Sequence, residues 1–121
     1  MFLATMNKSK QLLCASFIEN VTADELVRSY DEVAMMINDL QPGFRVLTDM
    51  GRLESISADC GVEIGKIMEL SDQKGVGLIV RVIPDPKKDI GLSILSLFHY
   101  SRRPRMVTCE NMLEAAKLLS L

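Results

Sequence analysis

Histidine, cysteine and aromatic residues are scarce in this sequence, and their scarcity excludes several kinds of site. The single histidine is His99, and the three cysteines, Cys14, Cys60 and Cys109, lie far apart in the chain. A metal site needs several such ligands at close spacing, so no metal and no cofactor are expected. An odd number of widely spaced cysteines is typical of a reduced chain, which predicts a cytoplasmic protein.

Long apolar runs and an excess of one charge are also missing. No apolar stretch reaches the roughly 18 residues that would predict a membrane span, and the start of the chain lacks the pattern of a secretory leader. The net charge of −2 gives no general attraction to nucleic acid or to an anionic membrane. The 121 residues, 48% of them apolar, predict one globular domain over residues 1–121.

The usual catalytic motifs are absent as well. The sequence has no glycine-rich phosphate loop of the usual spacing and no serine elbow. A thiol activated by histidine would require Cys60 or Cys109 to meet His99, and nothing in the spacing supports either pair. The sequence therefore predicts a non-enzymatic protein.

Strands and helices alternate along most of the chain. Thr22 stands three residues before Glu25, a capping box that predicts a helix ending before Pro42. Gly75 is a typical helix stop. The expected order, β-β-α-β-α-β-α-β-α, predicts an α/β fold with a four- to five-stranded, mostly parallel sheet, an antiparallel N-terminal strand and four helices. The strands are expected at residues 2–5, 11–18, 44–49, 76–83 and 105–108, and the helices after residue 22 and at about 58–74, 90–100 and 110–119.

The stretch "SISADCG", which ends at Gly61, lies at the expected start of the second helix. The free N–H groups and the dipole of a helix start favour negative charge, so a phosphate on Ser57 or a thiolate at Cys60 would be stabilised there. The simpler interpretation is structural: Ser57 caps the helix, Asp59 complements the dipole and Cys60 points into the core. Gly61 and Gly65 lower helix propensity, which predicts a close approach of this helix to the sheet.

The third expected helix, "IGLSILSLFHY", is apolar over most of its circumference. Its polar residues are Ser93, Ser96 and His99, and one sheet face cannot cover all the other side chains. Two interpretations stay open: another element covers the surplus, or the surplus binds a protein partner or a second copy. The arginines that follow suit either a solvated loop or recognition of an acidic group. The candidate partner-binding residues are Leu92, Leu95, Phe98 and Tyr100, with Arg102 and Arg103 at the polar rim.

Nearly the whole chain, residues 2–119, resembles the STAS domain, which is named for sulfate transporters and anti-sigma factor antagonists. Four stretches carry the resemblance. "TADELVRSYDEV" is similar to the first helix of the family, "FRVLTDMGRLESISADCG" to its central strand and turn, "DQKGVGLIVRVI" to the next helix end and strand, and "MVTCENMLEAAKLL" to the last strand and helix. Their order and spacing carry more weight than any one of them. The resemblance implies a divergent, stand-alone member with the STAS fold.

The resemblance implies a regulatory role in which the chain docks a protein partner near the second-helix start and the third helix. The partner would be an anti-sigma kinase-like regulator, or a second copy in a homodimer. In the bacterial regulators of the family, the serine just before the glycine is phosphorylated. With that glycine matched to Gly61, Cys60 stands at the serine position and Ser57 is a displaced substitute. The phosphorylation switch is therefore not expected here, although Asp59 offers a fixed negative charge.

A second hypothesis, from a different class, is a small-ligand-binding domain. Arginines beside an apolar helix suit a nucleotide, a lipid or another anionic amphiphile. The sequence does not decide between this hypothesis and protein docking.

Overall fold

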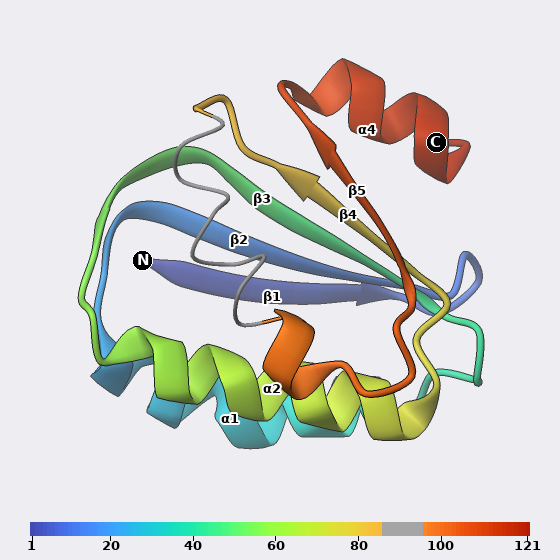
Figure 1. Ribbon diagram of the computed structural model, residues 1–121, viewed down its shortest axis with the longest axis horizontal. Coiled ribbons are helices and arrows are strands. Elements are labelled where there is room, and N and C mark those ends of the chain that lie inside the picture. Colours follow the sequence, from blue (N-terminus) through green and yellow to red (C-terminus); the bar gives the residue numbers. More distant parts are fainter. Residues whose placement is uncertain (86–95) are drawn as a thin grey trace.

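The computed structural model of the protein describes residues 1–85 and 96–121, and its centre is a five-stranded mixed sheet. The strand order is β1-β2-β3-β4-β5, so each strand lies beside the one that precedes it in the sequence (Figure 1). β1 pairs with β2 antiparallel, and the other pairs are parallel. The predicted α/β class, the antiparallel first strand and the mostly parallel sheet are confirmed. The strands are β1 (Phe2–Asn7), β2 (Leu12–Val21), β3 (Arg45–Ile56), β4 (Leu78–Val82) and β5 (Arg105–Cys109).

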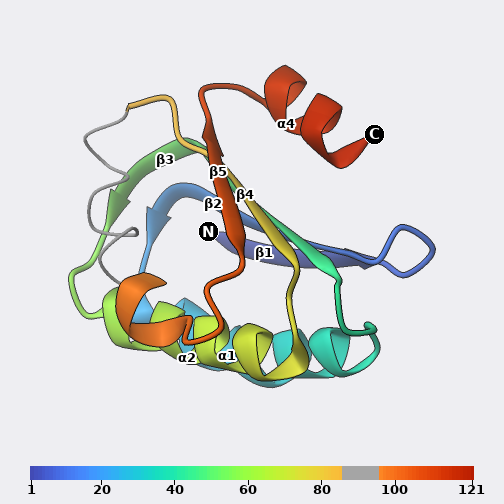
Figure 2. The same cartoon turned by 45° about the vertical axis from the view of Figure 1, so that its right-hand side comes forward.

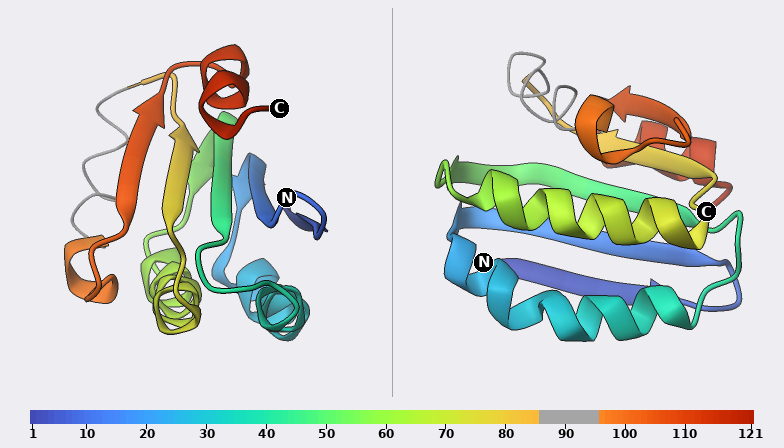
Figure 3. Two further views of the ribbon diagram at one scale, coloured as in Figure 1. Left: turned by 90° about the vertical axis from the view of Figure 1, so that its right-hand side faces the viewer. Right: turned by 60° about the horizontal axis from the view of Figure 1, so that its bottom comes forward.

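Helices cover the two faces of the sheet unequally. α1 (Ala23–Asn38) and α2 (Cys60–Lys74) lie side by side against one face, whereas α4 (Met112–Leu119) lies on the other (Figures 2 and 3). A short helix at residues 96–99 lies beside α2. The larger apolar core fills the space between α1, α2 and the sheet, and a smaller one lies under α4. One sheet face therefore carries most of the packing, and the same side carries both candidate surfaces.

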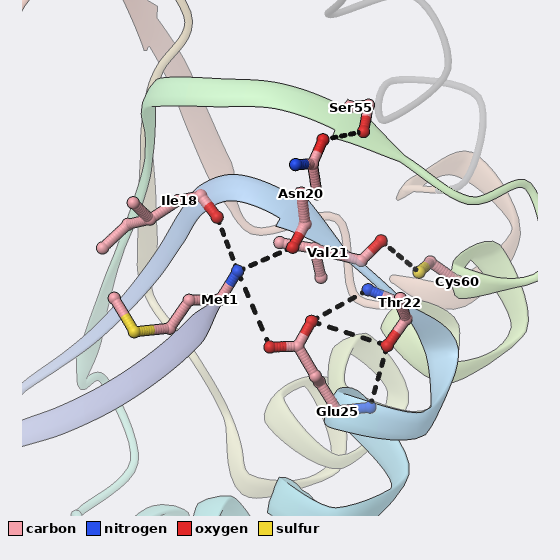
Figure 4. Close-up of polar contacts among 8 residues, drawn as sticks. All are labelled: Met1, Ile18, Asn20, Val21, Thr22, Glu25, Ser55 and Cys60. Carbon is pink, nitrogen blue, oxygen red and sulfur yellow. Dashed lines mark hydrogen bonds and ion pairs between the residues drawn. The ribbon is translucent and has the colours of Figure 1, made fainter.

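A capping box starts α1, as predicted. Glu25 N–H donates to Thr22 Oγ1 at 3.4 Å, and Thr22 N–H donates to Glu25 Oε2 at 3.0 Å (Figure 4). The same carboxylate lies 3.6 Å from the ammonium group of Met1. The hydrogen bond from the Thr22 backbone lowers the pKa of Glu25. This cluster fixes the start of α1 against Met1, the residue before β1.

Replacing Thr22 with alanine is expected to lower the free energy of unfolding by about 1 kcal/mol, because the Glu25 N–H loses its acceptor. Chemical denaturation of the two proteins measures the difference. The matched control is Arg28→Ala on the exposed side of α1, which should change the value by less than about 0.5 kcal/mol. Equal midpoints for Thr22→Ala and the native sequence would show that the capping box does not stabilise the fold.

β3 is longer than the sequence predicts. The expected strand ended at Asp49, but β3 continues to Ile56 and pairs with β2 as far as Val21. Two register shifts interrupt this pairing. Most residues of the added part are exposed, so they lack the apolar alternation that would have indicated a strand. The extension carries the chain to the start of α2 with almost no loop.

The predicted third helix falls only partly within the described residues. Residues 86–95, which include Leu92 and Leu95, lie outside them, while residues 96–99 are helical as expected. Tyr100 is 5% exposed and belongs to the larger core. This position corrects the expectation that Tyr100 supplies surface contact, because its ring fills the core where the chain turns toward β5.

Within residues 1–85 and 96–121, no helix is both long and apolar enough to span a membrane. The same residues hold no group of three or more histidine, cysteine, aspartate or glutamate side chains that could bind a metal ion. The thiols of Cys14, Cys60 and Cys109 are free.

Candidate functional site

The turn before α2 differs in detail from the expected helix start. α2 begins at Cys60 rather than near Ala58, and the N-cap residue Asp59 makes no side-chain capping bond. The expected capping role of Ser57 is therefore wrong. Ser57 Oγ instead lies 3.2 Å from Cys60 Sγ, and the Ser57 carbonyl accepts the Cys60 N–H at 3.0 Å. Ser57 thus closes the turn through Cys60.

Cys60 points into the core, as the structural interpretation predicted. Its side chain is 1% exposed, and its Sγ lies 3.7 Å from the Val21 carbonyl that accepts its hydrogen bond (Figure 4). A buried and engaged thiol is out of reach of a phosphate donor or a substrate. Ser57 and Asp59 are exposed. A partner at this turn can therefore reach the Ser57 hydroxyl and the Asp59 carboxylate, but not the sulfur.

Asp72 lies in α2 and anchors the segment that follows the short helix. This carboxylate is 6% exposed. It accepts hydrogen bonds from the Ser101 N–H at 3.2 Å, the Ser101 hydroxyl at 2.8 Å and the Arg102 N–H at 3.2 Å. A buried carboxylate is costly unless such bonds satisfy it, so the contact fixes where this segment lies.

Gly65 makes room for His99 and not for the sheet. A Cβ at Gly65 would lie 2.6 Å from His99 Nε2, which is closer than real atoms approach, whereas a Cβ at Gly61 would meet nothing within 4 Å. The expected close approach of both glycines to the sheet is therefore wrong. The His99 ring also places Nδ1 2.8 Å from Glu69 Oε1. The imidazole thus rests on α2 between Gly65 and Glu69.

Leu97 and Phe98 form the exposed side of the short helix. Their side chains are 77% and 79% exposed. Because His99 rests on Gly65, the short helix that carries these two residues lies against α2. The described end of the predicted third helix therefore lies next to α2, the helix that follows the turn at residues 57–59. We call Leu97 and Phe98 the apolar surface.

The arginines lie toward the other end of α2. Arg102 follows the Asp72 contact, and its Nη1 lies near Gly75, the residue that ends α2 in the left-handed conformation. Arg103 is exposed and has a positive φ of 49°. The two arginines are thus separated from Ser57 by the length of α2, and they border the apolar surface only on its far side.

Arg81 is a buried residue that the sequence analysis did not single out. It lies in β4 with 4% of its surface exposed, and it donates hydrogen bonds to Ser96 Oγ and, at 3.4 Å, to Met106 Sδ. The nearby Tyr100 has its pKa raised by burial, an effect that the positive charge of Arg81 opposes. The signal was visible as one charge inside the apolar run "GLIVRVI". Arg81 ties the short helix to β4.

Two hollows bear on small-ligand binding. The core between α2 and the sheet holds a cavity of about 50 Å³, bordered in part by Arg81 and Tyr100. A groove of about 350 Å³ lies on the opposite sheet face, near the start of α4, and Asp49, Arg52 and Glu110 are among its lining residues. The cavity is too small for a nucleotide or a lipid, since ligand pockets usually measure 300–1,000 Å³. The groove is lined by two carboxylates and one guanidinium group, so its charge does not favour an anion.

Comparison with known proteins gives the fold. No known family profile matches the sequence, and no curated protein sequence matches it either. The structure is similar to the anti-sigma factor antagonist SpoIIAA in its unphosphorylated form, with a TM-score of 0.67 and 11% identity over 99% of this chain and 98% of that one. The phosphorylated Bacillus cell fate determinant SpoIIAA gives a TM-score of 0.60 and 12% identity, covering 98% and 99% of the two chains.

A third similar structure is an uncharacterised protein of the DUF3478 family from Shewanella loihica PV-4. It has a SpoIIAA-like fold, and it gives a TM-score of 0.72 and 12% identity over 98% of this chain and 92% of that one. At these identities the likeness speaks for the fold, which agrees with the fold that the four sequence stretches imply. The chain has the STAS-like fold of SpoIIAA.

Proposed function

We propose that this chain is a non-enzymatic regulatory module that docks a protein partner through the apolar surface and the start of α2. The partner class is an anti-sigma factor-like regulator, by analogy with the antagonist whose fold it shares. The observation that carries the proposal is the exposure of Leu97 and Phe98, 77% and 79%, on a helix held in place by Asp72, His99 and Arg81. Exposed apolar side chains on an anchored helix are typical of binding anchors.

The turn Ser57–Gly61 is the regulatory part of this proposal. Cys60 takes no phosphate, because it is buried and bonded to Val21. Asp59 contributes a fixed negative charge beside the helix start, and Ser57 contributes a hydroxyl that a partner can reach. Gly61, which has open space around its Cα, lets a partner approach the first turn of α2 closely. Arg102 and Arg103 complete the far rim.

The free thiols favour a binding role over an enzymatic one. Burial raises the pKa of Cys14, and the charge of Asp49 raises it further. Burial and the charge of Glu114 raise the pKa of Cys109. Thiols with raised pKa values are poor nucleophiles at neutral pH. Three free thiols also agree with the proposed cytoplasmic location.

The double variant Leu97→Asp/Phe98→Asp tests the docking surface. The native chain and the variant are immobilised, and the proteins that each retains from its native cell extract are identified by mass spectrometry. The proposal expects a regulator of the anti-sigma class on the native chain and its loss from the variant. With that regulator purified, titration calorimetry should give an affinity at least about 100-fold weaker for the variant, since two buried anchors are lost.

The matched control is Leu113→Asp, which adds a charge at a 68% exposed leucine of α4 on the opposite sheet face. It should bind as the native chain does. Equal retention by native chain and double variant would refute the proposed surface. If the native chain retains only further copies of itself, and the double variant does not, the partner at this surface would be a second copy in a homodimer and not a regulator.

A further inference from the structure

β1 forms a free edge of the sheet, and half of its backbone groups point away from β2. Ile18 N–H donates to the Met1 carbonyl at 2.8 Å, and the Met1 nitrogen donates back to Ile18 at 2.6 Å. In an antiparallel ladder such reciprocal pairs alternate, so residues 3, 5 and 7 also bond to β2. The backbone groups of Phe2, Ala4 and Met6 therefore face away from the sheet. Within the described residues, no hydrogen-bond partner is seen for those of Ala4 and Met6.

The strand itself lacks three of the features by which proteins commonly protect such edges. Its sequence, "FLATMN", has no charged residue and no proline, and its pairing with β2 runs without a register shift. Leu3, on the strand's outer face, is 48% exposed. The other edge strand, β5, begins with the charged Arg105. β1 is thus the edge at which another strand can be added.

We propose that β1 pairs antiparallel with β1 of a second copy, around a two-fold axis at Ala4. This register sets Ala4 opposite the partner's Ala4 and Phe2 opposite the partner's Met6. The Ala4 N–H groups then donate to Ala4 carbonyls across the axis, and the Met6 N–H groups donate to Phe2 carbonyls. The Phe2 N–H is excluded, because it already faces the Glu25 carboxylate. A second copy is the fitting occupant, since the free groups are matched by the strand's own two-fold image.

Charge permits this register, and shape favours it. It carries the partner's Lys8 past Met1, where the Met1 ammonium group and the Glu25 carboxylate lie 3.6 Å apart and balance each other. At the other end, a groove of about 420 Å³ lies between β1 and α1, and Met6, Glu32, Met35 and Met36 are among its lining residues. Met35 is 73% exposed. The groove gives the paired strands an apolar side-chain contact beside the backbone bonds.

This interface is separate from the docking surface. β1 is one edge strand of the sheet and lies close to α1, whereas the short helix at residues 96–99 lies beside α2 on the side of β5, the other edge strand. A copy paired at β1 would therefore leave the apolar surface open. One dimer would present two docking surfaces at once.

Sedimentation equilibrium of the native chain and of Ala4→Pro tests the pairing. Proline at position 4 removes an N–H that β2 does not use, and proline is tolerated at such edge positions. The native chain is expected to form dimers with a dissociation constant of about 0.1 mM or lower. Ala4→Pro should raise this dissociation constant at least about tenfold. A native chain that stays monomeric, or a dimer unaffected in a folded Ala4→Pro protein, would overturn the proposal.

A charge exchange tests the register independently of any effect of proline on folding. Leu3 and Thr5 lie on the outer face, and the proposed pairing sets Leu3 opposite the partner's Thr5. Thr5→Lys and Leu3→Glu are each expected to dimerise less than the native chain, while their mixture should form a heterodimer about two- to fivefold tighter than the average of the two. The control mixture combines Thr5→Lys with Leu113→Glu, and its heterodimer should be no tighter than the average of the two homodimers. If the mixture of Thr5→Lys and Leu3→Glu forms a heterodimer no tighter than the average of the two homodimers, the proposed register is wrong.

Discussion

Replacing Asp72 with alanine is expected to lower the free energy of unfolding by about 3 kcal/mol and to release the segment after the short helix. The carboxylate accepts bonds from Ser101 N–H, Ser101 Oγ and Arg102 N–H, and a hydrogen bond to a charged acceptor contributes a net free energy of about 1.5–3 kcal/mol, which three bonds sharing one carboxylate do not simply multiply. Chemical denaturation measures the loss of stability. Hydrogen exchange of the Ser101 and Arg102 amides measures the release, and it should quicken more than exchange in β3.

The neighbouring exposed residue provides the control for Asp72. Gln73→Ala removes a similar volume from the outer side of α2 and should change the free energy of unfolding by less than about 0.5 kcal/mol. The loss in free energy of unfolding for Asp72→Asn should lie between those for Asp72→Ala and Gln73→Ala, because the amide keeps one acceptor oxygen where the carboxylate had two. Unchanged exchange at Ser101 in Asp72→Ala would mean that other contacts, such as that of Arg81 with Ser96, hold this segment without Asp72.

The second large effect is expected at two glycines of the same helix, with opposite signs. Alanine at Gly61 should raise the free energy of unfolding by about 0.5–1 kcal/mol, because helix propensity improves and the added methyl group meets nothing. Alanine at Gly65 should lower it by about 1 kcal/mol, because the methyl group displaces the His99 ring and breaks its contact with Glu69. Denaturation curves of the two single variants measure this difference.

A double-mutant cycle identifies the cause. In a His99→Ala background the obstacle is gone, so Gly65→Ala should become stabilising, as Gly61→Ala is. If Gly65→Ala destabilises the His99→Ala protein as much as the native one, the steric partner of Gly65 is some group other than the imidazole. The Gly65→Ala protein should also bind the proposed regulator more weakly, since Leu97 and Phe98 precede the displaced ring.

Local signals in the sequence were enough for the order of the elements. The capping box at Thr22 and Glu25 acts within four residues, so it could be identified without any tertiary contact. Gly75 ends α2 with a φ of 90°, a conformation that few other residues adopt readily. The burial of Cys60 could also be predicted locally, because Cys60 shares one face of the helix with Ile64, Ile67 and Met68.

Contacts between distant segments could not be predicted in this way. A glycine is needed at position 65 because the His99 ring packs against it, and His99 is far along the chain. The sequence alone does not show which residue contacts this glycine. Tyr100 looked like surplus surface, because nothing local indicates that a residue after an exposed helix turns into the core. The length of β3 was missed because pairing with β2, rather than apolar alternation, maintains its second half.

The placement of each strand beside its predecessor has a consequence for biosynthesis. As the polypeptide emerges from the ribosome, every new strand finds its neighbour already made, and no completed ladder has to open to admit a later arrival. The two-stranded hairpin can serve as the template for the third strand while the rest is still being translated. At each stage of this stepwise growth, few incorrect strand pairings are available to the unfinished sheet.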